Sequence, residues 1–542
     1  MLCSGVALAA QLPRLPSTVE PGREPPPSID VPEGQFDFSI AAPRKTALPS
    51  DVETLRFVVK KISIEGTTVF KHGDLMPLVD PLIGTEASLA DIMRLAQALE
   101  ARYREEGYLL TRAIVPPQHT KDGEFRIQVI EAFINAIVVD GVEGGLKDSI
   151  AEILAPVLQE RPLTAATMER GLLLVNDLPG IHAVGLLKPA ADEVGGADLQ
   201  ITVSQQRLSA SASADNRASR YSGPVIANVN VAVNSLAISG DQLGAGVTRS
   251  IDPHKQRGYR VHYSVPIGAD GLVATTTLER NLGQPGYTLA PLDITTDSIA
   301  IGERLSYPLV RSRSFNLFVD GGFTWKTART DILGQAATFD QTSVADVKLS
   351  ASQSGWLDGV TAGSLGLAKG LSVLAASRPG AANLSRPNAD PQFTNLEFDV
   401  RRVQPVTPEL SLVLTGVGQR AFSSLLAGDQ FALGGYQYGR GFDPAALTGD
   451  SGVGGSAELH YDIPVPLIDR LQTYGFYDYG WVWDHQSTKS SSLSSVGFGI
   501  RAPITSYVDI TAEAAHRLHG PAPTVMPDEA ARVLFSLQAR WW

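Results

Sequence analysis

Three short stretches of the chain contain residue types that could act chemically. Gly449–Gly452 reads GDSG, the string found around the nucleophilic serine of chymotrypsin-like proteases, but no matching histidine motif precedes it. His516 and His519 are three residues apart, and in a strand that spacing places them on opposite faces. The third stretch, GGYQYGRGFDP, holds one arginine, Arg440, among glycines.

No other catalytic pattern is present. The sequence contains no G-x-S-x-G elbow, no phosphate-binding loop and no H-E-x-x-H motif. Cys3 is the only cysteine, which excludes a disulfide framework and a thiolate metal site. We therefore expect a protein that is not an enzyme and that uses no cofactor and no metal.

The composition narrows the class of protein. The chain has 542 residues and a formal net charge of −12, which argues against nucleic acid as a partner. No run of 18 apolar residues occurs, so helical membrane spans are not expected. The sequence is still compatible with a membrane β-barrel, because the alternating pattern of such a barrel is weak in each single strand.

The first 54 residues differ from the rest. Residues 1–10 resemble the end of a signal peptide, although the usual positive region is missing. Nine prolines follow between residues 11 and 50, which suits an extended linker. We expect residues 1–54 to be a signal remnant and a proline-rich linker.

Residues 55–206 repeat one order of elements. In residues 55–133, a strand ending at Gly66 precedes a helix that Ser88 and Asp91 cap, and two strands follow. Residues 134–206 repeat this order, with a helix that begins at Thr164. The sequence predicts two tandem α+β modules of the β-α-α-β-β type.

Residues 207–542 show no convincing amphipathic helix and instead contain sixteen segments with period-two alternation. Short proline-containing turns alternate with longer polar or glycine-rich loops, such as 329–340, 373–393 and 422–453. Short turns on one side and long loops on the other are typical of bacterial outer-membrane barrels. A soluble sandwich or propeller would also have many strands, but its outward residues would be polar.

Residue parity predicts which side of each strand meets lipid. Within Phe315–Trp325, one face carries Phe315, Leu317, Val319, Phe323 and Trp325, and the other carries Asn316, Asp320 and Thr324. In Thr473–Trp483 the odd positions carry four aromatic residues, whereas Asp478 lies on the even side. A charged aspartate at the centre of a strand would destabilise the barrel if it faced lipid, so Asp478 should face the lumen. In the last strand Phe535, Leu537 and Trp541 should face outward as an assembly signal, with the aromatic residue penultimate rather than last.

The α+β modules resemble the polypeptide-transport-associated (POTRA) domain, and the glycine-rich stretch lies in the sixth long loop, between the eleventh and twelfth strands. Together with the barrel, these features make the chain resemble the two-partner secretion transporters, which export filamentous haemagglutinins and haemolysins. In that family the sixth loop carries Val-Arg-Gly-Phe/Tyr and folds back into the barrel, and strand thirteen carries Phe-x-Asp-x-Gly. In the strand, Phe476, Asp478 and Gly480 match the family, and in the loop Gly439 replaces the usual valine. The matching loop residues are Gly434, Gly435, Arg440, Gly441, Phe442, Gly449, Asp450 and Gly452.

The resemblance implies POTRA 1 at 55–133, POTRA 2 at 134–206 and a 16-stranded transmembrane barrel at 207–542. It also implies that Arg440 pairs with Asp478 and anchors the loop in the lumen, because an arginine fork on a carboxylate forms a directional, charge-assisted bond.

The function that the resemblance implies is the export of a protein across the outer membrane. The POTRA domains would lie in the periplasm and bind the unfolded N-terminal secretion domain of a large exoprotein, which would cross the barrel pore, with haemolysin activation in some relatives. Outer-membrane lipid, lipopolysaccharide and the barrel assembly machinery would be further partners. One alternative is an outer-membrane insertase with the same loop motif. The other is a passive porin or a surface ligand-binding barrel, and a barrel of that kind would need neither POTRA modules nor the Arg440 and Asp478 motifs.

Overall fold

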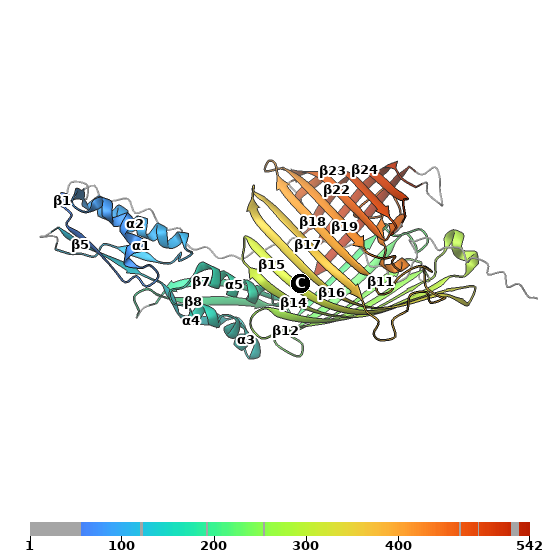
Figure 1. Cartoon of the computed structure of the whole chain (residues 1–542), viewed down its shortest axis with the longest axis horizontal. Coiled ribbons are helices and arrows are strands. Elements are labelled where there is room, and N and C mark those ends of the chain that lie inside the picture. Colours follow the sequence, from blue (N-terminus) through green and yellow to red (C-terminus); the bar gives the residue numbers. More distant parts are fainter. Residues whose placement is uncertain are drawn as a thin grey trace, which may run out of the picture. The chain divides into compact units, whose positions relative to one another are not determined.

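A computed structural model describes residues 56–119, 123–190, 193–252, 255–465, 468–485, 487–521 and 530–541 (Figure 1). The signal remnant and linker expected at 1–54 lie outside these ranges. Residues 56–205 belong to one compact unit, and the chain from Gln206 onward forms the body of a second. None of the described helices is long and apolar enough to cross a membrane.

The first α+β module contains three helical segments and five strands. Its elements are β1 (Arg56–Val58), β2 (Lys61–Glu65), α1 (His72–Val79), η3 (Asp80–Leu82), β3 (Glu86–Ser88), α2 (Leu89–Glu105), β4 (Arg112–Ile114) and β5 (Glu124–Ile130). The main sheet has the order β2-β5-β4, with β2 parallel and β4 antiparallel to β5, and β1 pairs with β3 separately.

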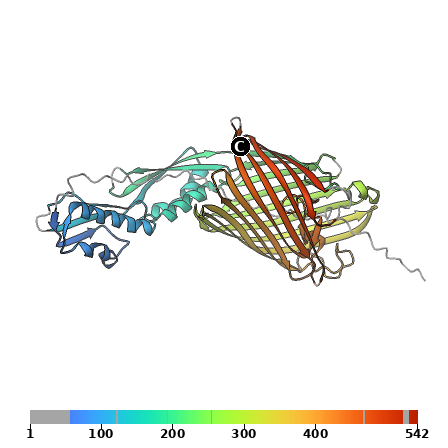
Figure 2. The same ribbon diagram turned by 90° about the horizontal axis from the view of Figure 1, so that it is seen from above.

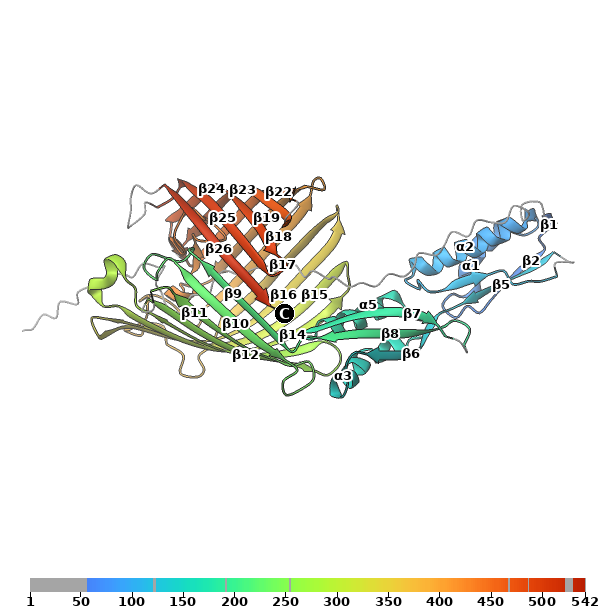
Figure 3. The same ribbon diagram turned by 180° about the vertical axis from the view of Figure 1, so that it is seen from behind.

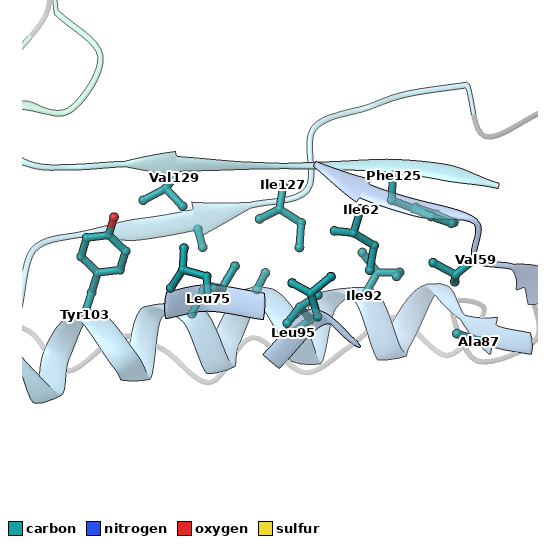
Figure 4. Close-up of a cluster of buried hydrophobic side chains, with 14 residues drawn as sticks. Val59, Ile62, Leu75, Ala87, Ile92, Leu95, Tyr103, Phe125, Ile127 and Val129 are labelled. Atoms are coloured by element: carbon teal, nitrogen blue, oxygen red, sulfur yellow. The ribbon is translucent and has the colours of Figure 1, made fainter. Parts of the chain in front are cut away.

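Helix α2 follows from its sequence. The backbone N–H of Asp91 donates to Ser88 Oγ at 3.2 Å, and the N–H of Ser88 donates to Asp91 Oδ2 at 2.8 Å, so the capping box forms as expected. Its buried face, which includes Ile92, Leu95, Leu99 and Tyr103, packs against the inward side chains of the sheet (Figure 4). Gly107, with φ +90°, ends the helical turn.

The expected first strand is interrupted. Between Val59 and Lys60 the backbone changes partner, because the Val59 N–H donates to the Thr85 carbonyl whereas the Lys60 N–H donates to the Gly123 carbonyl. The chain therefore leaves the small β1-β3 sheet and enters the main sheet within two residues. Helix α1 was not located from the sequence, since His-Gly-Asp and an internal Pro77 obscure its helical pattern.

The second module has a three-stranded sheet of the same topology as the main sheet of the first. Its elements are β6 (Phe133–Asp140), α3 (Gly145–Ile153), α4 (Ala155–Gln159), α5 (Ala165–Asn176), β7 (Ile181–Pro189) and β8 (Gly196–Gln205). The sheet order is β6-β8-β7, with β6 parallel to β8 and β7 antiparallel to it. Thr164 caps α5 by accepting from the Thr167 N–H at 3.3 Å, and the apolar side of the helix is buried.

Within the described ranges, sixteen strands close into one barrel, in which the last strand, β26, pairs with the first, β9 (Figure 3). Strands on opposite sides of the barrel cross one another obliquely, as a tilted barrel requires (Figure 2). They are β9 (Leu208–Asp215), β10 (Ile226–Asn234), β11 (Gln242–Ser250), β12 (Gln256–Ile267), β13 (Leu272–Gly283), β14 (Thr295–Arg311), β15 (Phe315–Ile332), β16 (Gln335–Trp356), β17 (Gly359–Gly370), β18 (Thr394–Pro405), β19 (Leu410–Ala421), β22 (Ser451–Val465), β23 (Ile468–Trp483), β24 (Ser490–Thr505), β25 (Val508–His519) and β26 (Ala531–Trp541).

The two faces of the barrel wall alternate as the sequence predicts. On β23, Tyr477, Tyr479 and Trp481 are 40–48% exposed, whereas Asp478 is fully buried. On β26, Phe535, Leu537 and Trp541 are each about half exposed, on one side of the strand. A row of apolar side chains without protein neighbours is what a lipid-facing surface requires.

One expected loop is absent. Residues 329–340 form the continuous ends of β15 and β16, joined by a tight turn at Leu333 and Gly334 with φ +50° and +72°. Positive φ at both central residues matches the twist of a two-residue hairpin. The two strands have 18 and 22 residues, longer than the roughly 9–11 that cross a bilayer, so this hairpin projects beyond the membrane.

Candidate functional site

The glycine-rich stretch belongs to the loop of residues 422–450, between β19 and β22, which are the eleventh and twelfth barrel strands. A short hairpin closes the base of this loop, where β20 (Phe431–Leu433) pairs with β21 (Leu447–Gly449). A 3-10 turn, η5 (Ala427–Asp429), precedes the hairpin. The residues between the two short strands therefore form a compact unit, which we call the inner loop (residues 434–446).

Arg440 extends from the inner loop to Asp478 on β23. Its Nη2 lies 2.7 Å from Asp478 Oδ1 and its Nε lies 3.1 Å from Oδ2, which is a bidentate ion pair. The backbone N–H groups of Gly439 and Arg440 also donate to Oδ2, at 3.3 and 3.0 Å. Arg440 is 3% exposed and Asp478 is 0% exposed, so the pair is shielded from bulk water.

Two serines complete the coordination of Asp478. Ser456 Oγ donates to Oδ1 at 2.8 Å, and Ser495 Oγ donates to Oδ2 at 3.0 Å. These serines lie on β22 and β24, the two strands that flank β23. A buried carboxylate is tolerated when its lone pairs are satisfied in this way.

The guanidinium of Arg440 contacts two further carboxylates and a ring. Its Nη1 lies 2.8 Å from Glu458 Oε1 on β22 and 3.4 Å from Glu513 Oε1 on β25. The guanidinium carbon lies 3.5 Å from the centre of the Phe476 ring, in a cation–π contact. One arginine thus joins the inner loop to three strands of the barrel wall.

Glycines allow the loop to approach that wall. A Cβ on Gly480 would lie 2.5 Å from Leu433 Cδ1, so only glycine lets the fully buried Leu433 reach β23. Gly434 and Gly435 have φ +105° and +90°, which L side chains rarely adopt. A Cβ on Gly441 would lie 3.1 Å from atoms of both Arg517 and Ser495.

The structure explains why residue 439 is glycine where the family motif has valine. Its φ is +94°, and a Cβ there would lie 2.5 Å from Leu493 Cδ1 on β24. A β-branched residue is strongly disfavoured at positive φ, so the valine expected from the resemblance would not fit this backbone.

Phe442 forms the apolar part of the attachment. Its side chain is 3% exposed and packs in a cluster with Leu433, Tyr438, Val482 and Leu493, among others. The carbonyl of Gly441 accepts from Arg517 Nε at 2.8 Å, and Arg532 donates to the carbonyl of Phe442. Because Arg532 lies on β26, the inner loop also contacts the last strand of the barrel.

Most of the partners around Arg440 could not be found from the sequence. Glu458, Glu513, Ser456 and Ser495 lie on three different strands, and no short motif connects them. The one available signal was parity: on β22 and β23, Ser456, Glu458 and Asp478 share the side that faces away from the exposed aromatic residues.

A second charged cluster fixes the outer loop of residues 371–393, which joins β17 and β18. Arg386 in this loop contacts Asp450 through Nη1 and lies 3.3 Å from Asp484 through Nη2. Asp450 is fully buried and accepts from the backbone N–H groups of Leu425 and His485, at 2.9 and 2.8 Å. The aspartate of the GDSG string is thus engaged by an arginine and two backbone groups.

The serine of that string is also structural. Ser451 Oγ accepts from the Ala421 N–H at 3.0 Å and holds β19 against β22. Among the described residues, no group of three His, Cys, Asp or Glu side chains is placed to hold a metal ion. The geometry of the site is therefore that of an electrostatic anchor for a loop.

Comparison with known proteins places this architecture in a family. Residues 195–502 match the family described as haemolysin secretion/activation protein ShlB/FhaC/HecB, and residues 57–132 match the ShlB-type POTRA domain. The heme/hemopexin transporter HuxB of Haemophilus influenzae (strain 86-028NP) is 26% identical, with 79% of this chain and 77% of that protein covered. The hemolysin transporter HpmB of Proteus mirabilis is also 26% identical, with 73% and 70% covered.

Solved structures agree on the fold. CdiB from Escherichia coli aligns with a TM-score of 0.73 at 18% identity, covering 93% of each chain. BamA from Haemophilus ducreyi, solved without its first three POTRA domains, aligns with a TM-score of 0.52 at 12% identity, over 90% of this chain and all of that one. The family match covers more than half of the 542 residues and favours the secretion transporter over the insertase and the porin. The chain therefore belongs to the ShlB/FhaC/HecB family of haemolysin secretion/activation proteins, the two-partner secretion transporters that lie in the outer membrane, with POTRA domains in the periplasm, and export an exoprotein.

Proposed function

We propose that the POTRA modules bind the unfolded N-terminal secretion domain of a large exoprotein and that the exoprotein crosses the membrane through the barrel, past the inner loop. The observation that carries this proposal is the attachment of the inner loop to the barrel wall through Arg440 and Asp478. A passive pore has no need of a loop fixed by a buried, multiply bonded arginine.

Capture by the POTRA modules would use the backbone of a sheet edge, to which an extended peptide adds as a further strand. The β4 edge is poorly suited, because its three residues precede Pro116 and Pro117 and Glu100 accepts from the Ala113 N–H at 3.0 Å. In the second module, Asn176 bonds both the N–H and the carbonyl of Ala183 on β7. These side-chain contacts disfavour β4 and β7 and leave β2 and β6, the opposite edges of the two sheets, as the candidate capture strands.

Transport would need no catalytic chemistry. The periplasm contains no ATP, so the folding free energy of the exoprotein at the cell surface would drive the movement. Arg440, Asp478 and their neighbours would set the position of the inner loop and thereby the width of the path. Phe535, Leu537 and Trp541 would present the last strand to the barrel assembly machinery when the transporter itself is inserted.

The test is deletion of the gene in its own host, followed by complementation with the full chain. We expect loss of one large exoprotein from the medium, recovery on complementation, and unchanged amounts of other outer-membrane barrels. Unchanged secretion together with reduced amounts of other barrels would overturn the proposal and indicate an insertase.

A further inference from the structure

A polar pocket lies at one end of the barrel, where β12, β13, β14 and β15 meet their loops. It has a volume of about 340 Å³, and Arg257, Leu282, Asp297, Arg329 and Asp331 are among its lining residues. Arg257 pairs with Leu282, and Leu282 pairs with Asp297, so these three residues form one row across neighbouring strands.

The pocket opens on the outward side of the barrel. Residues directly opposite in an antiparallel ladder share a face, and alternate residues along a strand share it too. Arg257 therefore shares the face of Tyr259, and Asp297 shares that of Ile299 and Ile301, all apolar or aromatic and 37–47% exposed. The pocket thus continues the lipid-facing surface and does not open into the lumen.

The pocket also lies at the cell-surface end. β9 follows the periplasmic POTRA modules directly, so it begins at the periplasmic end, and successive strands alternate in direction. β12 and β14 therefore begin, and β13 and β15 end, at the outer leaflet, where Arg257, Asp297, Leu282 and Arg329 lie. The headgroups of outer-leaflet lipids meet the protein at this level.

The charges in and beside the pocket leave one arginine unpaired. Arg280 makes a bidentate pair with Asp297, at 3.2 and 2.8 Å, and Arg329 pairs with Asp331 at 2.9 Å. Arg257 forms no ion pair with any carboxylate in the described part of the chain, and its buried Nε has no hydrogen-bond partner there. Arg280 and Asp293, which lie beside the four charged lining residues, leave the formal charges balanced, so the unpaired Arg257 and not a net charge marks the site.

An unpaired arginine in such a pocket suits an anion with tetrahedral oxygens, because the guanidinium fork matches phosphate geometry. Phosphate can come from a lipid headgroup or from solution. The apolar row that leads from the pocket toward the membrane centre, with Leu278, Ile299 and Ile301, suits acyl chains and favours the lipid. We propose that this pocket binds a phosphate of lipopolysaccharide, the phosphorylated glycolipid of the outer leaflet.

The test begins with the intact protein purified from outer membranes in nonionic detergent. The lipopolysaccharide that remains bound per barrel is quantified for the wild type, Arg257→Glu and Arg260→Ala. Arg260 is the matched control: it lies three residues along β12 on the opposite face, where it contacts Glu279. Loss of a charge-assisted contact should reduce retention by about tenfold in Arg257→Glu, whereas Arg260→Ala should match the wild type. Heat-modifiable migration of each variant in gels shows that its barrel is folded.

A second arm identifies the source of the phosphate. Delipidated wild-type protein is heated with lipid A, with dephosphorylated lipid A, or with inorganic phosphate alone, and the midpoint of unfolding is measured. We expect lipid A to raise the midpoint more than dephosphorylated lipid A, and only in proteins that keep Arg257. Equal retention by Arg257→Glu and Arg260→Ala, equal shifts with both forms of lipid A, or the full shift with inorganic phosphate would each overturn the proposal.

Discussion

At the scale of single residues, one arginine combines three kinds of interaction. Arg440 pairs with Asp478, lies over the Phe476 ring and reaches Glu458 and Glu513. Breaking a buried pair by removing one partner typically costs about 3–5 kcal/mol, because the other charge stays buried. Asp478 keeps the hydroxyl donors of Ser456 and Ser495 on the barrel wall when the Arg440 side chain is removed, even if the loop moves away. The loss of this side chain should therefore release the loop without unfolding the barrel.

Gly439 gives a prediction about the loop backbone. Gly439→Ala places a Cβ at positive φ and close to Leu493, so the inner loop should leave the wall more often. We expect faster cleavage within residues 434–446 when a protease is added to purified protein. Gly321→Ala is the control, since a Cβ there meets no atom within 4 Å. Equal cleavage rates in the two variants would contradict this account of Gly439.

Glu131 gives a prediction about pH in the first POTRA module. Burial by itself would raise the pKa of Glu131, but hydrogen-bond donors to the carboxylate outweigh this effect, and the pKa lies below its ordinary value. The donors are the Thr68 hydroxyl, the Tyr103 hydroxyl at 2.7 Å and the N–H groups of Thr68 and Val69. A carboxyl group with a lowered folded-state pKa stabilises the fold above its unfolded-state pKa, and this contribution is lost as pH falls through the folded-state value.

Glu131→Gln should therefore lower the free energy of unfolding by about 1–3 kcal/mol at neutral pH, and the difference from the wild type should shrink below about pH 4. Urea unfolding of the tandem POTRA segment, followed by circular dichroism, measures this. Glu124→Gln, at an exposed position on β5, the strand that ends just before Glu131, should have little effect. A deficit that stays constant from pH 7 to pH 3 would show that Glu131 acts through packing and not through charge.

At the scale of elements, the two long outer loops are fastened to each other. Arg386 of the 371–393 loop contacts Asp450 at the base of the inner loop, and Leu384 and Ala389 pack against Leu426. Two hydrogen bonds also join the loops, from the Ala427 N–H to Ser385 Oγ and from the Asp390 N–H to the Ser424 carbonyl. Arg386 supplies the charge-assisted contacts, so its removal should loosen the attachment of the 371–393 loop.

Arg386→Ala should expose the 371–393 loop, because a charge-assisted contact contributes about 1.5–3 kcal/mol. Labelling of a cysteine introduced at Leu384, which is 5% exposed, should become faster in whole cells. Arg378→Ala, which removes an exposed side chain of the same loop, should leave the labelling rate unchanged. Equal labelling in both backgrounds would show that the loop is held by other contacts.

The sequence predicted elements best where a pattern repeats. The sixteen strands were predicted from the alternation of apolar and polar residues, and the pairing of Arg440 with Asp478 was predicted because each residue lies within a short motif. The interruption at Val59 and Lys60 was missed because the change of partner depends on Thr85 and Gly123, which are distant along the chain. Glu458, Glu513 and Arg386 were missed for the same reason, since their partners lie on other strands or loops and meet them only in the folded structure.

At the scale of the whole molecule, a barrel wall with one lipid-facing side surrounds a polar interior to which the inner loop is attached. The loop contacts β22, β23 and β25 through Arg440 and β26 through Arg532, so its position depends on the correct assembly of the last strands of the barrel. The family assignment agrees with this arrangement, since it unites the POTRA modules and the barrel in one exporter.

The central claim is that the Arg440–Asp478 anchor is needed for export. The most direct measurement is the amount of exoprotein secreted by cells with the wild type, Arg440→Ala, Asp478→Ala, the double variant, or Arg304→Ala, at matched levels of folded barrel. Arg304 is the control, because it pairs with Asp346 at 3.1 Å elsewhere on the wall, away from the inner loop. We predict that both single variants lose most secretion, that the double variant is no worse than either, and that Arg304→Ala secretes normally. Normal secretion by Arg440→Ala, or an equal loss in Arg304→Ala, would contradict the account.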